Sequence, residues 1–463
     1  MMFPRLKRTR AVLAGATVLA VTAMTFAGCS PSTDSSTKDG GSATQGTLNW
    51  WSWTPDNDLA EREIAAFNKV YPDIKVTYKK INSDQLSAVL RPALASDDGP
   101  DVFTVNASGS HSAQAFAAYA EDLTPHIKKL LGDDWRSKVF APGADAFTVK
   151  GRLVAAEWAK VGAGMMWINQ DMFDKYGLKP PKNLAEWKTL CATFRSKGHG
   201  CFQEGFASTS NFGTDTLHSL VNNVDPNAWT NALSGKGKWN SPAFVKGLQN
   251  LRTLQAEGIL DKGAVGVQQY PDVNNAFLSG KIPMVQMGTW YSQYATVNSM
   301  EAALEGAGVP KGTKKITIMP IPFPDVSGSG IPMTVYSDPD AGQAVNAKSK
   351  HLNAAITFAL WLGNTPEGAH VVANNLDEFP TLKGEDVGPQ WDKIKLVNPK
   401  VQQPALKAQT KLLEESTAPR NIGMSAEVGQ AITDAAQAMV NSTKTPQQVA
   451  DTIQAAADSG EGR

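Results

Sequence analysis

The sequence has no excess of charge of either sign. Its 463 residues carry 44 Lys and Arg against 44 Asp and Glu. Four of the bases (Arg5, Lys7, Arg8 and Arg10) lie in the first 28 residues, where there is no acid, so the remainder holds 40 bases and 44 acids, a net charge of −4. Nucleic acids and anionic membrane surfaces both require a basic face. The charge balance therefore argues against nucleic acid as a partner.

Cysteine and histidine are scarce. The cysteines are Cys29, Cys191 and Cys201, and the six histidines are scattered, with only His199 near the last two cysteines. No metal site is expected, because no second pair of ligands follows. A disulfide between Cys191 and Cys201 would close a short loop and is sterically reasonable in an oxidising compartment, with two free thiols as the alternative.

The motifs of several enzyme classes are missing. The chain has no Gly-x-Ser-x-Gly nucleophile elbow, and none of its Gly-Lys pairs is followed by Ser or Thr as in a phosphate-binding loop. Acyl transfer of that type and nucleotide hydrolysis are therefore disfavoured. We expect no catalytic activity and no cofactor.

Long apolar runs are also missing, except for a short one near the start. Residues 11–30 read AVLAGATVLAVTAMTFAGCS and follow the basic run, which is the layout of a secretory signal. The run is shorter than the roughly 20 residues of a stable membrane span. Residues 26–29 (FAGC) resemble the bacterial lipobox, in which the cysteine carries a lipid; ordinary cleavage beside an incidental cysteine is the alternative. We predict a signal peptide over 1–28, a lipid anchor at Cys29 and an extracytoplasmic protein held at the cell membrane.

The next segment, residues 29–46, is rich in Ser, Thr and Gly and predicts a flexible tether. From residue 47 the pattern changes to alternating strands and helices: strands at 47–53, 74–78 and 101–105, with helices at 57–71 and 83–96 between them. This order is typical of an α/β fold with a parallel sheet.

The rest of the chain continues the mixed pattern. Residues 151–169 predict two strands about a turn, and further strands are expected at 280–290 and 315–320. Helices are expected at 186–197, 241–256, 354–363, 403–416, 425–440 and 445–457.

Five stretches, taken in order, resemble the extracellular solute-binding proteins of ABC importers, in the family that includes sugar-binding lipoproteins. They are LNWWSW with AAFNKVYPDIKV; GPDVFTVNASG with AYAEDLTPHI; GRLVAAEWAKVGAGMMWINQDMFDKYGLKPPKNLAEWKTL; AFLSGKIPMVQMGTWY; and ITIMPIP with AKSKHLNAAITFALWLGNTPEG. Together they span most of residues 47–457.

The resemblance implies the type II periplasmic-binding-protein fold, with two α/β lobes and ligand enclosed between them. It places the N-terminal lobe at 47–156 plus 315–376 and the C-terminal lobe at 157–314 plus 377–463. The chain would cross between lobes near residues 157–162, 298–315 and 375–380. Closure of the hinge around ligand is the mechanism the resemblance implies.

A sugar offers apolar faces and a rim of hydroxyls, so its site needs aromatic rings and planar polar groups. Trp290 lies in GTWY, which matches the family's Gly-x-Trp motif, and Tyr291 follows it. Trp51, Trp53 and Asp56 lie at the carboxyl end of the first strand, where open α/β sheets bind ligands, and Asn106 ends the strand at 101–105. Core packing or turn formation would equally explain the residues near the first strand.

Weaker candidates come from the expected lobe crossings and loops. They are Trp158 and Lys160 at the first crossing, with hinge packing as the alternative, and Asn211 and Phe212 in a loop expected to border the cleft. Arg420 is the last, with a surface ion pair as the alternative. The prediction is a monomeric binding protein that delivers a carbohydrate, an oligosaccharide by preference, to an ABC permease. The alternatives are a binding protein for a polyamine, metal chelate or peptide, and a secreted glycoside hydrolase.

Overall fold

The computed structural model describes residues 40–460 except 208–211, 385–386 and 417. The predicted signal peptide and Cys29 lie outside these residues. The described chain forms two main β-sheets, each with its own hydrophobic core. We call each sheet with the helices packed on it a lobe.

The first sheet has six strands. At its parallel edge, strands and helices alternate along the chain as the sequence predicted. Its strand order is β12 (Phe379–Pro380), β6 (Ala156–Ala163), β11 (Tyr336–Val345), β3 (Val102–Asn106), β1 (Gly46–Ser52) and β2 (Ile74–Lys80). Strand β1 is parallel to β2 and β3, whereas β11 runs antiparallel to β3 and β6. Since β1 and β3 point the same way, their carboxyl ends meet at one edge of the sheet.

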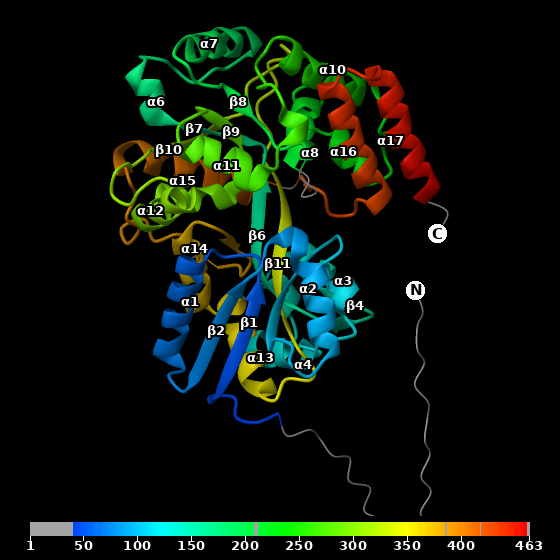
Figure 1. Ribbon diagram of the computed structural model, residues 1–463. Helices are drawn as coiled ribbons and strands as arrows, with labels where there is room; N and C mark the ends of the chain where they lie inside the picture. Colours follow the sequence, from blue (N-terminus) through cyan, green and yellow to red (C-terminus); the bar gives the residue numbers. More distant parts are fainter. Residues whose placement is uncertain (1–39, 208–211, 385–386, 417, 461–463) are drawn as a thin grey trace, which may run out of the picture. The chain divides into compact units, whose positions relative to one another are not determined.

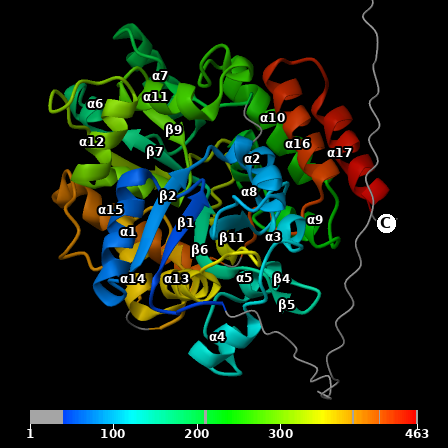
Figure 2. The ribbon, with the colours of Figure 1, turned by 60° about the horizontal axis from the view of Figure 1, so that its bottom comes forward.

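The helices of the first lobe bury its core. They are α1 (Asn57–Val70), α2 (Ser83–Ala95), α3 (Ala113–Phe116), α4 (Thr124–Leu131), η1 (Trp135–Ser137), α5 (Ala141–Ala146), α13 (Leu352–Asn364) and α14 (Pro366–Asn375), with a small hairpin of β4 (Thr148–Val149) and β5 (Arg152–Leu153). Helix α13 packs on β6 and β11, and α1 lies beside α14 next to β2 (Figures 1 and 2). Trp50 of β1 and Phe67 of α1 are fully buried in this core.

The second sheet has four strands, in the order β10 (Ile318–Pro322), β7 (Met165–Asn169), β9 (Met284–Gln286) and β8 (Phe202–Gln203). Its helices are α6 (Gln170–Lys175), α7 (Leu184–Ser196), α8 (Phe212–Asn222), α9 (Ala228–Leu233), α10 (Pro242–Ala256), η2 (Ala264–Gly266), η3 (Gln269–Val273), α11 (Asn274–Leu278), η4 (Thr289–Ala295), α12 (Val297–Gly306), α15 (Pro399–Glu415), α16 (Ala426–Val440) and α17 (Pro446–Gly460). Helices α8, α10, α16 and α17 pack on one another, and α15 packs on β10 (Figure 1).

Two long strands, β6 and β11, run side by side from one lobe toward the other (Figure 1). The sequence predicted two strands about a turn at 151–169, and both are present, but β6 belongs to the first sheet and β7 to the second. Gly164 makes the change of sheet possible: its φ is +101°, and a Cβ there would lie 2.5 Å from the carbonyl oxygen of Thr334.

The structure corrects the second predicted crossing. Residues 298–315 were expected to lead back to the first lobe, but β10 pairs with β7 in the second sheet, and Ile318 is buried in a core of the second lobe. The return crossing is β11, which pairs with β6 and β3. Strand β12, at the third predicted crossing, still pairs with β6 in the first sheet, and Leu382 after it lies in the first core.

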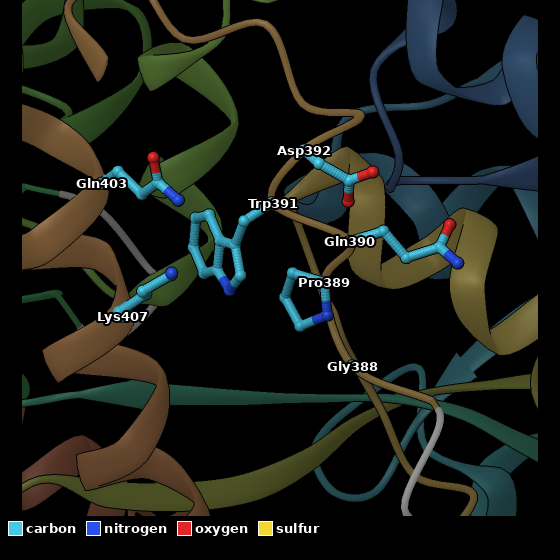
Figure 3. A pocket seen from close by; sticks show the side chains of 7 residues that line it. All are labelled: Gly388, Pro389, Gln390, Trp391, Asp392, Gln403 and Lys407. Carbon is cyan, nitrogen blue, oxygen red and sulfur yellow. The ribbon is translucent and has the colours of Figure 1, made fainter. Parts of the chain in front are cut away.

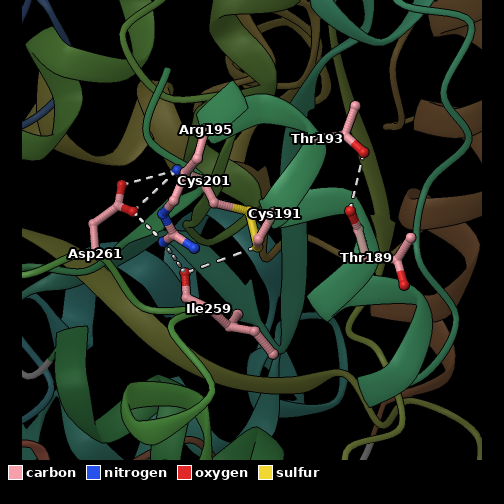
Figure 4. The surroundings of a disulfide bond; sticks show 7 residues. All are labelled: Thr189, Cys191, Thr193, Arg195, Cys201, Ile259 and Asp261. Carbon is pink, nitrogen blue, oxygen red and sulfur yellow. Dashed lines mark hydrogen bonds and ion pairs between the residues drawn. A yellow bond between two sulfur atoms is a disulfide. The ribbon is translucent and has the colours of Figure 1, made fainter. Parts of the chain in front are cut away.

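The predicted disulfide between Cys191 and Cys201 is confirmed (Figure 4). It joins α7 to the segment before β8, and both cysteines are buried. Beside it, Arg195 forms an ion pair of 2.6 Å with Asp261, whose carboxylate also accepts the backbone N–H of Cys201. The bridge thus ties the edge of the second sheet to its covering helix.

We expect the double substitution Cys191→Ser/Cys201→Ser to destabilise the protein by about 2–4 kcal/mol, because the cross-link no longer restricts the unfolded chain. Calorimetry should show a melting temperature lower by several degrees. A reductant should lower the melting temperature of the native protein by a similar amount and leave that of the double variant unchanged. Equal melting temperatures of native protein and double variant would contradict this expectation.

Candidate functional site

A cleft of about 780 Å³ lies where the two lobes face each other. From the first lobe it is lined by residues that follow β1 and β3, among them Trp53, Thr54, Asp56 and Asn106. From the second lobe it is lined by Phe212, Tyr270, Trp290, Gln293, Tyr294 and Arg420. The crossing segments supply Val161, Asp338, Pro339, Asp340, Asp377 and Glu378. The cleft therefore lies at the carboxyl ends of the parallel strands, as expected for an open α/β sheet.

Trp290 presents an aromatic wall of the second lobe. Its Nε1 donates to the hydroxyl of Tyr270 at 3.1 Å, and its ring centroid lies 6.2 Å from that of Phe212. A Cβ on Gly288 would lie 1.9 Å from Cζ3 of Trp290, so the ring folds back over the glycine and would have to move for any larger residue. This contact gives the Gly-x-Trp motif a physical reason, since the glycine makes room for the tryptophan.

Trp53 presents an aromatic ring from the first lobe. It is half-buried, packs on the first core and lies edge-on to His111, with ring centroids 5.1 Å apart. Trp53 and Trp290 thus bring one tryptophan from each lobe to the same cleft. Aromatic rings of this kind can stack on the apolar face of a sugar.

Asp377 links the two lobes across the back of the cleft. Thr54 of the first lobe donates its hydroxyl to Oδ2 at 2.8 Å, and Gln293 of the second lobe donates Nε2 to Oδ1 at 2.6 Å. Burial raises the pKa of the Asp377 carboxyl to about 7, against the lowering effects of the Thr54 bond and the Lys80 charge. The negative charges of Asp340 and Asp58 raise this pKa further.

This raised pKa predicts a pH-dependent stability. The carboxyl of Asp377 titrates near pH 4 in the unfolded chain and near pH 7 in the folded protein, so the folded state binds the proton more tightly. The free energy of unfolding should therefore fall as the pH rises from about 4 to about 7, and this contribution should stay constant above that range. In Asp377→Asn the free energy of unfolding should fall less over this range. The melting temperature of the variant relative to that of the native protein should therefore rise between pH 4 and pH 8. Parallel curves for the two proteins would contradict the assignment.

Arg420 is held by a buried carboxylate. Its Nε and one terminal nitrogen donate to Asp215 at 2.8 and 2.6 Å, and both side chains are largely buried. The Asp215 carboxylate is the main cause that raises the pKa of Arg420, against the opposing effect of burial. The guanidinium carbon lies 5.2 Å from the ring centroid of Trp290, within cation–π range. Arg420 thus supports the tryptophan wall while its own charge is neutralised.

Asp338 fixes the loop that carries Arg420. Its carboxylate accepts the backbone N–H groups of Arg420, Asn421 and Ile422 at 2.6–2.9 Å. Burial raises the pKa of Asp338 to about 6, although these backbone bonds lower it. The crossing strand β11 therefore positions a second-lobe side chain at the cleft.

Six of the predicted site residues line the cleft: Trp53, Asp56, Asn106, Phe212, Trp290 and Arg420. Asn211 lies outside the described residues. Asp56 forms an ion pair with Lys80 and accepts the hydroxyl of Tyr294 at 3.3 Å, so it bridges the lobes. Asn106 donates to Asp340 at 3.2 Å. These placements agree with a role in binding, which remains a prediction for each residue.

Four predicted residues lie away from the cleft lining. Tyr291 is fully buried and donates to Asn274, because η4 turns it inward where its neighbour Trp290 faces the cleft. Trp158 is buried against Trp50, with ring centroids 6.0 Å apart. Lys160 lies over the ring of Phe140 in the first lobe, with Nζ 5.1 Å from the ring centroid.

Trp51 is the fourth. It lies under the ammonium of Lys79, whose Nζ is 3.9 Å from the ring centroid. Alternation along the strand predicted at 47–53 would put Trp51 and Trp53 on one face. Strand β1 ends at Ser52, so the alternation does not extend to Trp53.

Sequence reasoning missed the acidic residues of the cleft. Asp338, Pro339 and Asp340 all line it, because β11 has an irregular register between Pro339 and Ala341 that breaks the alternation of faces. Asp377 and Glu378 lie just before β12 at the third crossing. Consecutive acids at an expected crossing were a visible signal, whereas nothing in the sequence around Tyr270 pointed to the cleft.

A second cavity of about 590 Å³ lies in the second lobe near α15 (Figure 3). Trp391 and Lys407 face each other there, with Nζ 5.9 Å from the ring centroid. Pro389, Gln390 and Asp392 line the same cavity from the segment before α15. It offers one aromatic ring and draws no residue from the first sheet.

Two lobes around a cleft with aromatic walls and buried polar groups define a ligand-binding protein of the two-lobed type. The sequence model of the family described as bacterial extracellular solute-binding protein matches residues 51–369. The chain belongs to this family, which places the protein outside the cytoplasm. Among the described helices, none has the length and hydrophobicity needed to cross a membrane.

Relatives and solved structures agree with this assignment. An uncharacterized ABC transporter extracellular-binding protein of Pyrococcus horikoshii is 22% identical over 364 residues, 76% of this chain and 75% of the relative. The melibiose/raffinose/stachyose-binding protein MelE of Bacillus subtilis is 22% identical over 260 residues, 53% of this chain and 56% of MelE.

Among solved structures, maltose-bound T. maritima MalE3 is similar with a TM-score of 0.65 at 17% identity, covering 88% of this chain and 98% of that one. A chitin oligosaccharide binding protein is similar with a TM-score of 0.62 at 20% identity, covering 89% and 98%. These likenesses confirm the predicted two-lobed α/β fold.

Proposed function

We propose that this protein captures a carbohydrate in the cleft and delivers it to the permease of an ABC importer. The observation that carries the proposal is the pair of tryptophans, Trp53 and Trp290, which reach the cleft from different lobes. Rings on both walls can stack on the two apolar faces of a sugar, and polar groups such as Asn106 and Gln293, which can bind hydroxyls, line the same cleft. The similarity to proteins named for melibiose, maltose and chitin oligosaccharides supports a sugar as ligand.

Hydrogen bonds across the cleft explain how ligand and lobe closure would be coupled. Asp377 binds Thr54 and Gln293, and Asp56 binds Tyr294, so each links the two sides. A sugar that contacts both lobes stabilises the state in which they are close, by its difference in affinity between the open and closed states. The permease would then recognise the closed form.

The cleft does not favour a glycoside hydrolase. Such enzymes place two carboxyl groups about 5–9.5 Å apart, on either side of the scissile bond. Here the carboxyls of Asp340 and Glu378 are hydrogen-bonded to one another, and those of Asp338 and Asp377 are occupied by protein donors. We therefore propose binding without catalysis.

A thermal-shift screen of the purified protein against sugars, polyamines, peptides and ferric chelates tests the class of ligand. A ligand at 100 times its dissociation constant should stabilise the protein by about 2.7 kcal/mol, which raises the melting temperature measurably. The proposal expects the shift from a mono- or oligosaccharide. A shift from a polyamine, peptide or chelate alone would overturn the carbohydrate assignment and leave the family assignment intact.

Lipid attachment at Cys29 is the second part of the proposal. It rests on the FAGC sequence after an apolar run, and on a family whose members act outside the cell. Substitution Cys29→Ser should release the protein from the membrane fraction of expressing cells, whereas Cys191→Ser should not. Retention of Cys29→Ser in the membrane fraction would contradict the anchor.

A further inference from the structure

The cleft holds more acids than cations. Its described lining includes five carboxyl residues, Asp56, Asp338, Asp340, Asp377 and Glu378, against the two cations Lys80 and Arg420. Both cations are already paired, Lys80 with Asp56 and Arg420 with Asp215. Four carboxyl groups of the cleft are therefore left without an ion-pair partner among the described residues.

These four carboxyls differ in how well they are satisfied. Asp338 accepts three backbone N–H groups, and Asp377 accepts from Thr54 and Gln293. Asp340 accepts from Asn106 and lies in hydrogen-bond contact with Glu378. Acids that already accept hydrogen bonds from the protein need no donor from a ligand. Glu378 is therefore the carboxyl that most needs one.

Glu378 is only 3% exposed, yet its Oε2 has no hydrogen-bond partner. Gln293, 4% exposed and on the opposite lobe, also has an unpaired oxygen, Oε1. Both residues line the cleft, and both unpaired atoms are acceptors. A buried acceptor without a donor is destabilising, and a ligand with N–H donors would pair with it.

The electrostatics of the Asp340–Glu378 pair favour a positive charge beside it. Burial raises the pKa of Glu378 well above its usual range, and the negative charges of Asp340 and Asp377 raise it further. Among the surrounding charges, Asp58 raises and Lys80 lowers the pKa of the neighbouring Asp377. Glu63 raises the pKa of Glu378. Arg420 lowers the pKa of Asp340. A cation placed against the pair would favour its doubly ionised form and allow release of the proton that the two carboxyls share.

We propose that the ligand is an amino sugar, a carbohydrate whose protonated amine lies against Asp340 and Glu378. An ammonium carries three N–H donors, which the unpaired acceptor atoms need. It also carries a positive charge, which the acids without an ion-pair partner need. The described residues contain no group of three His, Cys, Asp or Glu arranged to hold a metal ion, so an ammonium fits better than a metal cation. This inference rests on the proposed carbohydrate function.

Calorimetric titration of the purified protein with matched sugars tests the inference. The probes are glucose, galactose and mannose, their 2-amino-2-deoxy forms and N-acetylated forms, and the corresponding β-1,4-linked trisaccharides of glucose, glucosamine and N-acetylglucosamine. The tightest binder should be an amine, with an affinity about ten- to hundredfold above its hydroxyl and acetamide partners, the value of a charged hydrogen bond.

Substitutions locate the recognition. Asp340→Asn and Glu378→Gln should each remove most of the preference for the amine over its hydroxyl and acetamide partners. Asp392→Asn, which removes a carboxylate from the second cavity, should change nothing. Circular dichroism and melting temperature show whether each variant is folded.

The outcomes separate the inference from the function on which it rests. If a neutral or acetylated sugar binds tightest, the inference is overturned and the carbohydrate function stands. If no sugar binds, or a linear polyamine alone binds, both are overturned. A preference for the amine that survives both Asp340→Asn and Glu378→Gln would also overturn the inference.

Discussion

Replacing Trp290 with alanine is expected to weaken binding of the sugar about 30- to 1000-fold. The ring is a half-buried wall of the cleft, held by Tyr270 and Arg420, and loss of such an anchor costs about 2–4 kcal/mol of binding energy. Calorimetric titration with the sugar found in the screen measures the change.

Two further variants make this test specific. Gly288→Ala keeps the tryptophan but places a Cβ against its ring, so it should also weaken binding by displacing Trp290. Trp391→Ala removes a tryptophan from the second cavity and should leave binding unchanged (Figure 3). Native affinity in Trp290→Ala would contradict the assignment of this wall.

The second large effect is expected on stability, from Arg420→Met. The substitution leaves the carboxylate of Asp215 buried without its cation, and breaking a buried pair in this way costs about 3–5 kcal/mol. Unfolding in guanidinium chloride measures the loss.

The double variant Asp215→Asn/Arg420→Met should recover much of that stability, because no buried charge is left unpaired. Arg195→Met breaks the ion pair between Arg195 and Asp261, which is more exposed than the Arg420–Asp215 pair. This substitution should cost about 1 kcal/mol or less (Figure 4). Equal losses in Arg420→Met and Arg195→Met would show that burial of the Arg420 pair has no special consequence.

Much of the fold follows from local patterns. Helix α1 and strands β1 to β3 were predictable because alternating and helical spacings repeat over whole elements. The change of sheet at Gly164 was not, since the strand partners of β6 and β7 are separated from them by more than 100 residues of sequence. Pairing at such separations is decided by tertiary packing.

The residues of the site also divide into those that local sequence predicts and those that it does not. Trp290 was predictable from its motif, and its glycine has a steric reason in the structure. Tyr291 was not distinguishable from it, because the 3₁₀ turn of η4 decides which ring faces the cleft. The acids of β11 and of the third crossing meet only through contacts such as Asn106 with Asp340, 234 residues apart. No local spacing contains that information.

Hydrogen exchange with and without the bound sugar tests most directly whether ligand is held between the lobes. Binding to both walls predicts slower exchange in peptides that follow β1 and in peptides containing η4 and residues 377–380, from both lobes at once. Protection limited to one lobe, or limited to the segment around Trp391 before α15, would contradict a sugar site in this cleft.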